Sequence, residues 1–346
     1  MKPKLLTVEL WALGDLVLAT PFLRAATRSY EVAMLARPAA RELQPRLWPG
    51  VEVIPFESPW TAFRGKYVLT RWPWRNLARL AGELRRRRFD LGVSARWDPR
   101  DHLLLRLSGA RRRAGFPRVF SGLLLTDRLA LPPAEAHRYE NWRVLGRHLG
   151  MELPPRKEAA LDRARGATLE GAQPDVSARR PYQGGVVVIH SGAAQPARVW
   201  PLERFGFLAQ QLRGQGYAVE VVCDAGQREW WTGHGEKARV AGTIEELVAV
   251  LEGAGLFVGN DSGPGHLAGI LGIPTFTLFG NQFSSRFAPL DAQAEWMEGG
   301  DCVYKPCYDT CRFATPECLW GTGENQAWLK LKIFAAKHLN AAAPSK

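Results

Sequence analysis

Residues 259–267 read Gly259-Asn260-Asp261-Ser262-Gly263-Pro264-Gly265-His266-Leu267. The apolar residues 256–258 predict a strand and the apolar residues 263–271 predict a helix, so the polar residues stand at a strand-to-helix turn. Small residues at the start of a helix leave backbone N–H groups accessible, and these groups together with the helix dipole attract anions. A sharp turn can be rich in glycine for steric reasons alone. The combination of Asn, Asp, Ser and His with three glycines nevertheless favours an anion-binding site.

Short apolar runs alternate with longer helix-compatible segments on both sides of this turn. This alternation is typical of a parallel sheet built from βαβ units, so the predicted fold class is α/β. We expect strands at residues 4–10, 31–35, 51–54, 89–94, 186–190, 218–223, 256–258 and 275–279. We expect helices at residues 16–29, 77–88, 140–149, 201–214, 244–252 and 263–271.

The chain has 346 residues, which exceeds the size at which one hydrophobic core usually keeps growing. The alternating pattern weakens between residues 151 and 185, where Pro, Arg, Ala and Gly predominate. We therefore predict two doubly wound parallel-sheet domains, residues 1–160 and 185–346, joined by a linker at 161–184.

The net charge of +12 is spread unevenly along the chain. Residues 1–150 hold 27 Lys and Arg against 13 Asp and Glu, so the first half carries all the excess. Such a field favours an anionic partner, which could be a nucleic acid, anionic lipid headgroups or a phosphorylated substrate. A single run such as Arg111-Arg112-Arg113 is, by itself, as typical of a solvated face.

The sequence shows neither a long apolar segment nor a signal-peptide pattern, and we expect a cytoplasmic location. The stretch Arg71-Trp72-Pro73-Trp74-Arg75 combines aromatic and basic residues and is a candidate membrane-interface patch.

Ligands of open α/β sheets bind outside the carboxyl ends of the strands, so the residues after each strand are the candidates. After the first strand come Gly14, which permits a tight turn, and Asp15. Asp15 is either the N-cap of the next helix or a carboxylate that acts as a general base. Both interpretations remain open at this point.

Two further loops follow strands in the second half. Ser191, Gly192 and Ala193 bring backbone N–H groups close to a ligand, and Arg198 can hold phosphate oxygens or lie free on the surface. Asp224, beside Gly226 and Glu229, can accept hydrogen bonds from ribose hydroxyls or cap the following helix.

Two further features concern nucleotide-binding motifs and cysteines. The first strand is not followed by a Walker-type Gly-Lys-Ser/Thr or by GxGxxG, which argues against an NTPase or an NAD enzyme. Cys302, Cys307, Cys311 and Cys318 form a cluster that suggests zinc, although paired CxxC motifs are missing. A redox-sensitive or merely packed loop is the alternative.

Four motifs in order resemble glycosyltransferase family 9, the ADP-heptose:lipopolysaccharide heptosyltransferases and their relatives. They are Gly14-Asp15 with Thr20-Pro21, His190-Ser191-Gly192-Ala193 with Arg198 and Trp200-Pro201, the turn at 260–267, and Leu278-Phe279-Gly280. The resemblance covers nearly the whole chain. Three positions depart from the family's usual residues: Ser191, Gly265 and the pair Asn281-Gln282. These departures concern the sugar and the acceptor more than the phosphate site.

The resemblance implies a GT-B fold, in which two Rossmann-like domains face a cleft. It implies inverting transfer of a sugar, heptose from ADP-heptose, onto the inner core of lipopolysaccharide or a related glycolipid. Neither a metal nor a cofactor is expected beside the nucleotide-diphosphate sugar, which is a co-substrate.

The resemblance also implies roles for individual residues. Asp15 stands at the position of the catalytic base, and the acceptor is expected at Gly14, Arg96 and Arg100. The donor is expected at Ser191, Gly192, Ala193, Arg198, Asp224, Gly226, Glu229, Thr243, Asp261, Ser262, Gly263, Gly265 and His266.

The partners implied are the nucleotide sugar, an anionic glycolipid and the cytoplasmic face of the inner membrane, without nucleic acid. A nucleotide-sugar epimerase of the same fold is one alternative, because it needs a donor site but no basic acceptor surface. A basic nucleic-acid-binding protein is the other, since the sequence pI is about 9.8.

Overall fold

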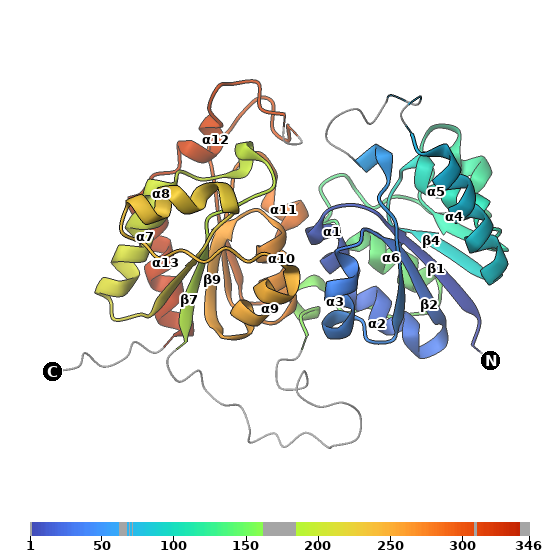
Figure 1. Cartoon of the computed structure of the whole chain (residues 1–346), viewed down its shortest axis with the longest axis horizontal. Coiled ribbons are helices and arrows are strands. Elements are labelled where there is room, and N and C mark those ends of the chain that lie inside the picture. Colours follow the sequence, from blue (N-terminus) through green and yellow to red (C-terminus); the bar gives the residue numbers. More distant parts are fainter. Residues whose placement is uncertain are drawn as a thin grey trace, which may run out of the picture. The chain divides into compact units, whose positions relative to one another are not determined.

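The computed structural model describes residues 2–61, 68, 70, 72–161, 185–307 and 310–339. It consists of two compact α/β units, Met1–Pro154 and Pro155–Lys346 (Figure 1). The expected linker at 161–184 lies outside the described residues except for Leu161, whose backbone N–H donates to the carbonyl of Ile270 in the second unit (2.7 Å). Among the described residues, no helix is both long enough and apolar enough to cross a bilayer.

The first unit contains a parallel six-stranded sheet in the order β3-β2-β1-β4-β5-β6. Its strands are β1 (Lys4–Glu9), β2 (Glu31–Ala36), β3 (Val51–Pro55), β4 (Leu91–Ser94), β5 (Arg112–Gly115) and β6 (Asp127–Arg128). Its α-helices are α1 (Leu13–Leu18), α2 (Thr20–Ser29), α3 (Ala40–Leu47), α4 (Trp74–Arg87), α5 (Pro99–Leu107) and α6 (Glu140–His148). Two 3₁₀ turns, η1 (Pro59–Thr61) and η3 (Val119–Leu124), complete it among the described residues.

The second unit contains a parallel five-stranded sheet in the order β11-β10-β9-β7-β8. Its strands are β7 (Val186–His190), β8 (Val219–Val222), β9 (Ala254–Asn260), β10 (Thr275–Phe279) and β11 (Ala294–Glu298). Its α-helices are α7 (Leu202–Gly214), α8 (Arg228–Gly233), α9 (Ile244–Glu252), α10 (Gly263–Ile270), α11 (Ser284–Phe287), α12 (Glu317–Trp320) and α13 (Glu324–His338). Its 3₁₀ turns are η4 (Arg156–Glu158), η5 (Pro196–Arg198) and η6 (Ala225–Gln227).

Each sheet has a point where the chain reverses its direction of travel across the strands. In the first unit the chain runs from β1 outward to β3 and returns to β4 on the other side of β1. In the second unit it runs from β7 to β8 and returns to β9 on the other side of β7. The loops that follow β1 and β4, and those that follow β7 and β9, therefore diverge at the carboxyl edge, which is where open α/β sheets bind ligands.

The central strands of each sheet anchor the loops at its carboxyl edge. Every residue of β9 is buried, and so are the last five residues of β1. Burial on both faces is typical of parallel strands covered by helices on each side. The loops that begin at the ends of these strands are thus anchored in the hydrophobic cores of their units.

Several elements differ from the sequence prediction. The helix expected at 16–29 is two helices, α1 and α2, which meet at Ala19. The Arg111-Arg112-Arg113 run is not only a solvated face, because Arg112 begins strand β5 and its Nη2 lies 2.8 Å from Oδ1 of Asp127. Helix α3 was not predicted; it contains Pro45, a residue that normally argues against a helix interior.

Candidate functional site

Asp15 is the third residue of α1, and Ala12 holds the N-cap position. The N-cap interpretation of Asp15 is therefore wrong. Gly14 is the second residue of the same helix, so the tight turn expected there is also wrong. Gly14 and Asp15 both lie at the N-terminal end of the helix that follows β1, at the reversal point of the first sheet.

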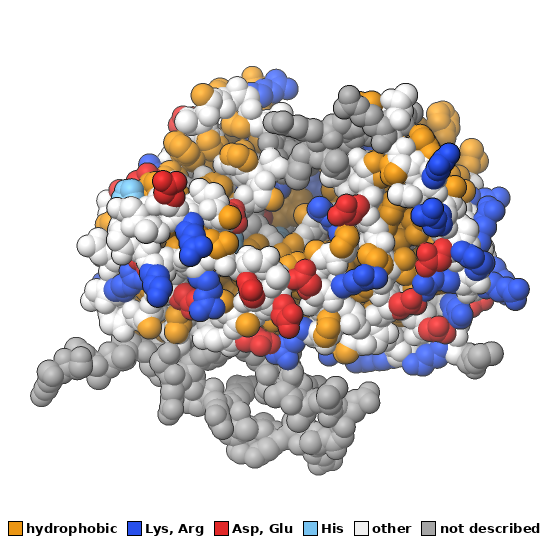
Figure 2. All heavy atoms as spheres, viewed as in Figure 1, with side chains coloured by type: hydrophobic (Ala, Val, Ile, Leu, Met, Phe, Trp, Pro, Cys, Tyr) orange, Lys and Arg blue, Asp and Glu red, His pale blue; other side chains and the backbone are white. Residues whose placement is uncertain are grey.

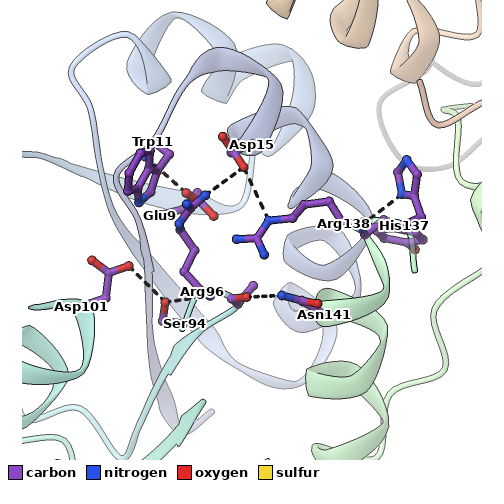
Figure 3. Close-up of polar contacts among 11 residues, drawn as sticks. Glu9, Trp11, Asp15, Ser94, Arg96, Asp101, His137, Arg138 and Asn141 are labelled. Atoms are coloured by element: carbon purple, nitrogen blue, oxygen red, sulfur yellow. Dashed lines mark hydrogen bonds and ion pairs between the residues drawn. The ribbon is translucent and has the colours of Figure 1, made fainter. Parts of the chain in front are cut away.

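The carboxylate of Asp15 faces two guanidinium groups (Figure 3). Its Oδ1 lies 3.1 Å from Nη1 of Arg96, which follows β4, and 3.9 Å from Nε of Arg138, which precedes α6. Arg96 was expected to bind the acceptor, and that role stays a prediction; the structure shows that Arg96 pairs with the candidate base. Both contacts are made to the same carboxylate oxygen, as the dashed lines in Figure 3 show.

The two guanidiniums are held in place by aromatic rings. Arg96 lies over the ring of Trp11, at 3.9 Å from the ring centroid, and Arg138 lies over Trp97 at 4.5 Å. A guanidinium at this distance from an indole is attracted by the π-system, which restricts its rotamers. The positions of both cations near Asp15 are therefore set by packing as well as by the ion pairs.

A second carboxyl group, Glu9, is buried at the end of β1 beside the Asp15 pair. Its Oε1 accepts a hydrogen bond from the backbone N–H of Trp11 (3.3 Å). Burial, and next the negative charge of Asp15, raise the pKa of Glu9 to about 8. The raised pKa favours the protonated form of Glu9 at neutral pH.

Asp101 and His102, in α5, support Arg96 from the opposite side. Burial raises the pKa of Asp101 to about 7, and Asp101 Oδ2 accepts from the hydroxyl of Ser94 (3.3 Å). Nε2 of His102 lies 3.2 Å from the backbone carbonyl of Arg96, and its Nδ1 lies 2.9 Å from Oγ of Ser121 in η3. Burial lowers the pKa of His102, so the neutral imidazole links these two groups.

Arg100, the other residue expected at the acceptor, makes a different contact. Its Nε and Nη2 donate to the two carboxylate oxygens of Asp98, at 2.8 and 2.7 Å. Asp98 is the N-cap of α5, which explains the pair as part of the helix terminus. A role of Arg100 toward the acceptor stays a prediction.

In the second unit, Arg198 and Asp261 join the two loops at the reversal point. Arg198 follows β7 and Asp261 follows β9, and Nη1 of Arg198 lies 3.3 Å from Oδ2 of Asp261. The buried side chain of Asn260 also links the two loops. Its Nδ2 donates to the carbonyl of Ser191 (2.9 Å), and its Oδ1 accepts from the backbone N–H of Trp200 (3.0 Å). The two loops quoted from the sequence are thus one structural unit.

The turn after β9 leads into the N-terminus of α10, with Ser262 as N-cap. The N–H groups of Gly265 and His266 donate to the carbonyl of Ser262, and Pro264 has no N–H. The Ser262 side chain, in a residue that is 8% exposed, has no hydrogen-bond partner within the part of the chain that the structure describes. Of the amides expected to bind an anion, the first turn of the helix already uses two, which leaves Gly263 as the best-placed N–H.

The residues expected around the ribose lie together but have structural roles as well. A Cβ on Gly192 would come within 2.4 Å of the Asp224 carboxylate, so a larger residue there would require the Asp224 side chain to move. Ser191 is fully buried, where its Oγ donates to Gln227 (2.9 Å) and accepts from the indole of Trp231 (3.0 Å). The Ser191 side chain therefore packs the loop, and any ligand contact of this loop belongs to its backbone.

The remaining expected donor residues are spread around this edge. Ala193 follows Gly192 in the same loop, Gly226 lies in η6, and Asp224 is the N-cap of that turn. Glu229 is exposed in the first turn of α8 and lines an open hollow with Ala225 and Arg228. Thr243 caps α9 by accepting from the N–H of Glu246 (3.1 Å), so its side chain has a structural function.

The four clustered cysteines line one cavity of about 310 Å³ beside Lys305. They are free thiols, and burial, then proximity to Cys302, raises the pKa of Cys318. Among the described residues, which leave out 308 and 309, His, Cys, Asp and Glu do not form a group of three or more that could hold a metal ion. The structure thus groups the cysteines without arranging them as metal ligands.

Sequence reasoning missed three residues of these sites: Glu9, Arg138 and Asn260. Glu9 is detectable as a carboxylate at the end of an otherwise apolar strand. Asn260 stood within the quoted turn, but its structural role depends on contacts with a loop far away in sequence. Arg138 is separated from Asp15 by more than a hundred residues, and only the fold brings them together.

Comparison with known proteins finds a matching family and a curated relative. Residues 77–314 match the model of "Glycosyltransferase family 9 (heptosyltransferase)". The chain is 31% identical over 108 residues to lipopolysaccharide heptosyltransferase 3 of Escherichia coli K12, which is 27% of this chain and 30% of that protein. The chain thus matches less than a third of the length of this curated relative.

Two solved structures resemble the whole chain. E. coli ADP-heptose lipopolysaccharide heptosyltransferase II has a TM-score of 0.70 at 18% identity, with 96% of this chain and 99% of that chain covered. A family 9 glycosyltransferase from Veillonella parvula has a TM-score of 0.73 at 17% identity, with 97% and 98% covered. At this identity the likeness describes the fold, and the expected GT-B fold with two parallel-sheet domains is confirmed.

The family match covers more than half of the chain and includes Arg96, Arg138, Arg198 and the turn after β9. The fold agrees with it. The protein therefore belongs to glycosyltransferase family 9, the heptosyltransferases.

Proposed function

We propose that this protein is an inverting glycosyltransferase that moves a heptose from ADP-heptose to a hydroxyl group of the lipopolysaccharide inner core or a related glycolipid. The observation that carries the proposal is the Asp15 carboxylate, held by Arg96 and Arg138 at the reversal point of the first sheet. ADP-heptose is suggested by the name of the E. coli structural relative, and lipopolysaccharide by that of the curated relative.

In this proposal Asp15 is the general base. Its Oδ1 contacts the two guanidiniums, and Oδ2 takes the proton of the acceptor hydroxyl as that oxygen attacks the anomeric carbon of the donor. The bond from the anomeric carbon to the diphosphate breaks, and ADP leaves with the electron pair. Attack opposite the leaving group inverts the anomeric configuration.

The departing diphosphate needs compensating charge, and the second unit offers it. Arg198, the N–H of Gly263, the hydroxyl of Ser262 and the N-terminus of α10 gather at the end of β9. A fixed cation and oriented dipoles stabilise charge that develops in the transition state without reorganising. We therefore propose that transfer needs neither a metal nor a further cofactor.

The basic first unit has the charge to attract an anionic acceptor. Arg96 and Arg138, with Gly14 beside Asp15, are the residues we propose to lie nearest the acceptor, and Arg100 lies in the first turn of α5. Because the proposed acceptor is a glycolipid, we also propose peripheral contact with the cytoplasmic face of the inner membrane.

The test is an assay of the purified protein with ADP-heptose and a lipid A–core acceptor, beside ADP-, UDP-, GDP- and CDP-hexoses. We expect transfer from ADP-heptose only, and a product whose anomeric configuration, measured by NMR, is opposite to that of the donor. A retained configuration, or an epimerised free nucleotide sugar, would contradict the proposal.

Metal independence is tested in the same assay with EDTA. We expect turnover to be unchanged. Loss of activity in EDTA that magnesium restores would contradict the proposal. Because the four cysteines could lose a structural zinc ion to EDTA, metal content and the melting temperature are measured in parallel.

A further inference from the structure

The 3₁₀ turn η3 (Val119–Leu124) presents three large apolar side chains to solvent. Val119, Phe120 and Leu123 are 78%, 83% and 77% exposed. Water-exposed apolar side chains are ordinary when scattered singly, whereas three within five residues of one turn form a patch.

The turn is fixed from beneath, so this exposure is not a consequence of a loose loop. Oγ of Ser121, which is buried, lies 2.9 Å from Nδ1 of His102 and accepts from the N–H of Arg118 (3.0 Å). Nε of Arg128 donates to the carbonyl of Gly122 (2.9 Å), and Nε of Arg113 donates to that of Leu124 (2.8 Å).

The backbone conformation of Val119 is a second observation that bears on the exposed patch. Its φ is 56°, in the left-handed region that a β-branched residue rarely adopts. Glycine or asparagine would fit this position with less strain. A valine there keeps an apolar side chain at the tip of the turn in spite of the cost.

Cations surround the patch. Arg118 begins the turn, Arg128 holds its carbonyl, and Arg111 and Arg112 lie on the neighbouring strand segment, all with exposed side chains. Figure 2 shows Lys and Arg side chains distributed over the first unit among hydrophobic ones. Apolar tips between guanidinium groups match the chemistry of an anionic bilayer, in which headgroup phosphates lie above acyl chains.

We propose that η3 is the membrane-docking element of this protein: Val119, Phe120 and Leu123 enter the headgroup–acyl boundary of an anionic bilayer while Arg118 and Arg128 contact lipid phosphates. This inference rests on the proposed function only in that a glycolipid acceptor requires a membrane. It also differs from the sequence prediction of a patch at residues 71–75. There Trp72 is partly buried against the hydrophobic core, with its ring 5.3 Å from that of Trp60, whereas Trp74 is 54% exposed and Arg71 lies outside the described residues. The patch at 71–75 stays a prediction.

The docking turn is connected to the candidate base within the same unit. Ser121 contacts His102, His102 contacts the carbonyl of Arg96, and the guanidinium of Arg96 contacts Asp15. A bilayer that holds η3 therefore holds Asp15, in α1, at a fixed height and angle above the membrane. This arrangement would favour an acceptor hydroxyl at a defined distance from the lipid.

The experiment measures binding of the full chain to sedimenting vesicles of phosphatidylcholine, with and without phosphatidylglycerol. We expect binding to the anionic vesicles, and a decrease of at least about tenfold for the double variant Phe120→Ser/Leu123→Ser, since burying each such side chain is worth about a tenfold change or more. Phe120→Trp should bind more tightly than wild type, because indole favours the membrane interface. Arg118→Gln should weaken binding to anionic vesicles only.

The matched control is Leu329→Ser/Ile333→Ser on α13 of the second unit, where the two side chains are 65% and 74% exposed. This control should bind like wild type. Equal binding of the η3 double variant and wild type would overturn the proposal, as would a loss shared by both double variants. If wild type is a dimer and the η3 variant a monomer by sedimentation, the turn is a self-association surface and the proposal is wrong.

Kinetics separate this proposal from the proposed function. With an acceptor embedded in vesicles, the η3 double variant should show a raised KM, whereas kcat/KM for a short-chain, detergent-free acceptor should match wild type. If neither acceptor is used by the wild-type protein, the proposed function fails while the vesicle-binding result stands by itself.

Discussion

The two units have the same kind of sheet and the same kind of edge, yet they place different chemistry there. At the reversal point of the first sheet, where β1 and β4 end, ionisable side chains meet: Asp15, Arg96 and the buried Glu9. At the reversal point of the second sheet, after β7 and β9, small residues and a helix N-terminus meet a single ion pair, Arg198 with Asp261.

The difference follows from what each proposed substrate requires. Removing a proton from a hydroxyl needs a carboxylate in a fixed position, which the neighbouring guanidinium groups and the rings packed on them provide. A diphosphate is already charged and needs close, rigid donors, which glycines and helix amides provide because they let the backbone approach. One topology thus supports two kinds of site, and mutations in each should affect different kinetic constants.

The largest effect is expected at Asp15. Asp15→Asn keeps the size of the side chain and removes its basicity, so turnover should fall by about 10² to 10⁴-fold with donor affinity nearly unchanged. Steady-state kinetics and calorimetry with ADP measure the two quantities.

The matched control is Asp127→Asn, because Asp127 is also an ion-paired aspartate of this unit. Its side chain is 18% exposed, against 21% for Asp15, and its Oδ1 lies 2.8 Å from Nη2 of Arg112 and 3.1 Å from Nε2 of His148. This control should lower the melting temperature but not turnover. If both variants lose turnover in proportion to stability, Asp15 is a structural ion-pair partner and not the base.

The next effect is expected at Arg198. Arg198→Ala should weaken ADP binding by about 1 to 3 kcal/mol, the range for a charge-assisted contact, and should leave binding of the acceptor unchanged. Calorimetry with ADP gives the affinity. Arg213→Ala is the control in the same unit, because it removes a guanidinium paired with Glu236 (2.6 Å) at the far end of α7. Equal ADP affinities for the Arg198 variant and wild type would exclude Arg198 from the donor site.

The sequence predicted the fold well because periodicity is a local property. Most strands and helices were found from apolar runs alone, and β7, β10 and α9 were found with their observed bounds. Other elements, among them α13, were not predicted, and two of these have misleading local composition. Strand β5 begins with arginines that pair across the sheet, and α3 contains a proline.

The sites were predictable only as far as they depend on neighbouring residues. Asp15 and Arg198 were found because each follows a strand. The contacts that position the site residues join segments that are distant in the sequence. They link Arg138 to Asp15, Asn260 to Ser191, and Ser121 to Arg96 through His102. A single sequence does not contain the strand order that brings such segments together, so the roles of Glu9 and Arg138 became visible only with the structure.

The smallest predicted effect concerns stability, and it compares buried carboxyl groups of the two units. Burial raises the pKa of Glu9 to about 8 and that of Asp101 to about 7 in the first unit, and that of Asp291 to about 6 in the second. The ordinary values are 4.5 for Glu and 3.8 for Asp. Between the ordinary and the raised pKa the folded protein holds a proton that the unfolded chain has lost.

The free energy of unfolding should therefore fall as pH rises, and each of the three groups should contribute about 1.4 kcal/mol per pH unit within its own window. Between pH 7 and 8 only Glu9 of the three still contributes, so Glu9→Gln, which cannot ionise, should remove the slope that this group causes there. Asp291→Asn should change the slope only below about pH 6.

Denaturant unfolding is measured at half-unit pH steps, and each variant is compared with wild type. The comparison cancels the contribution of the titrating groups that all the proteins share. A slope above pH 7 that is equal in wild type and Glu9→Gln would mean that Glu9 is already ionised at neutral pH. That outcome would contradict the raised pKa of Glu9.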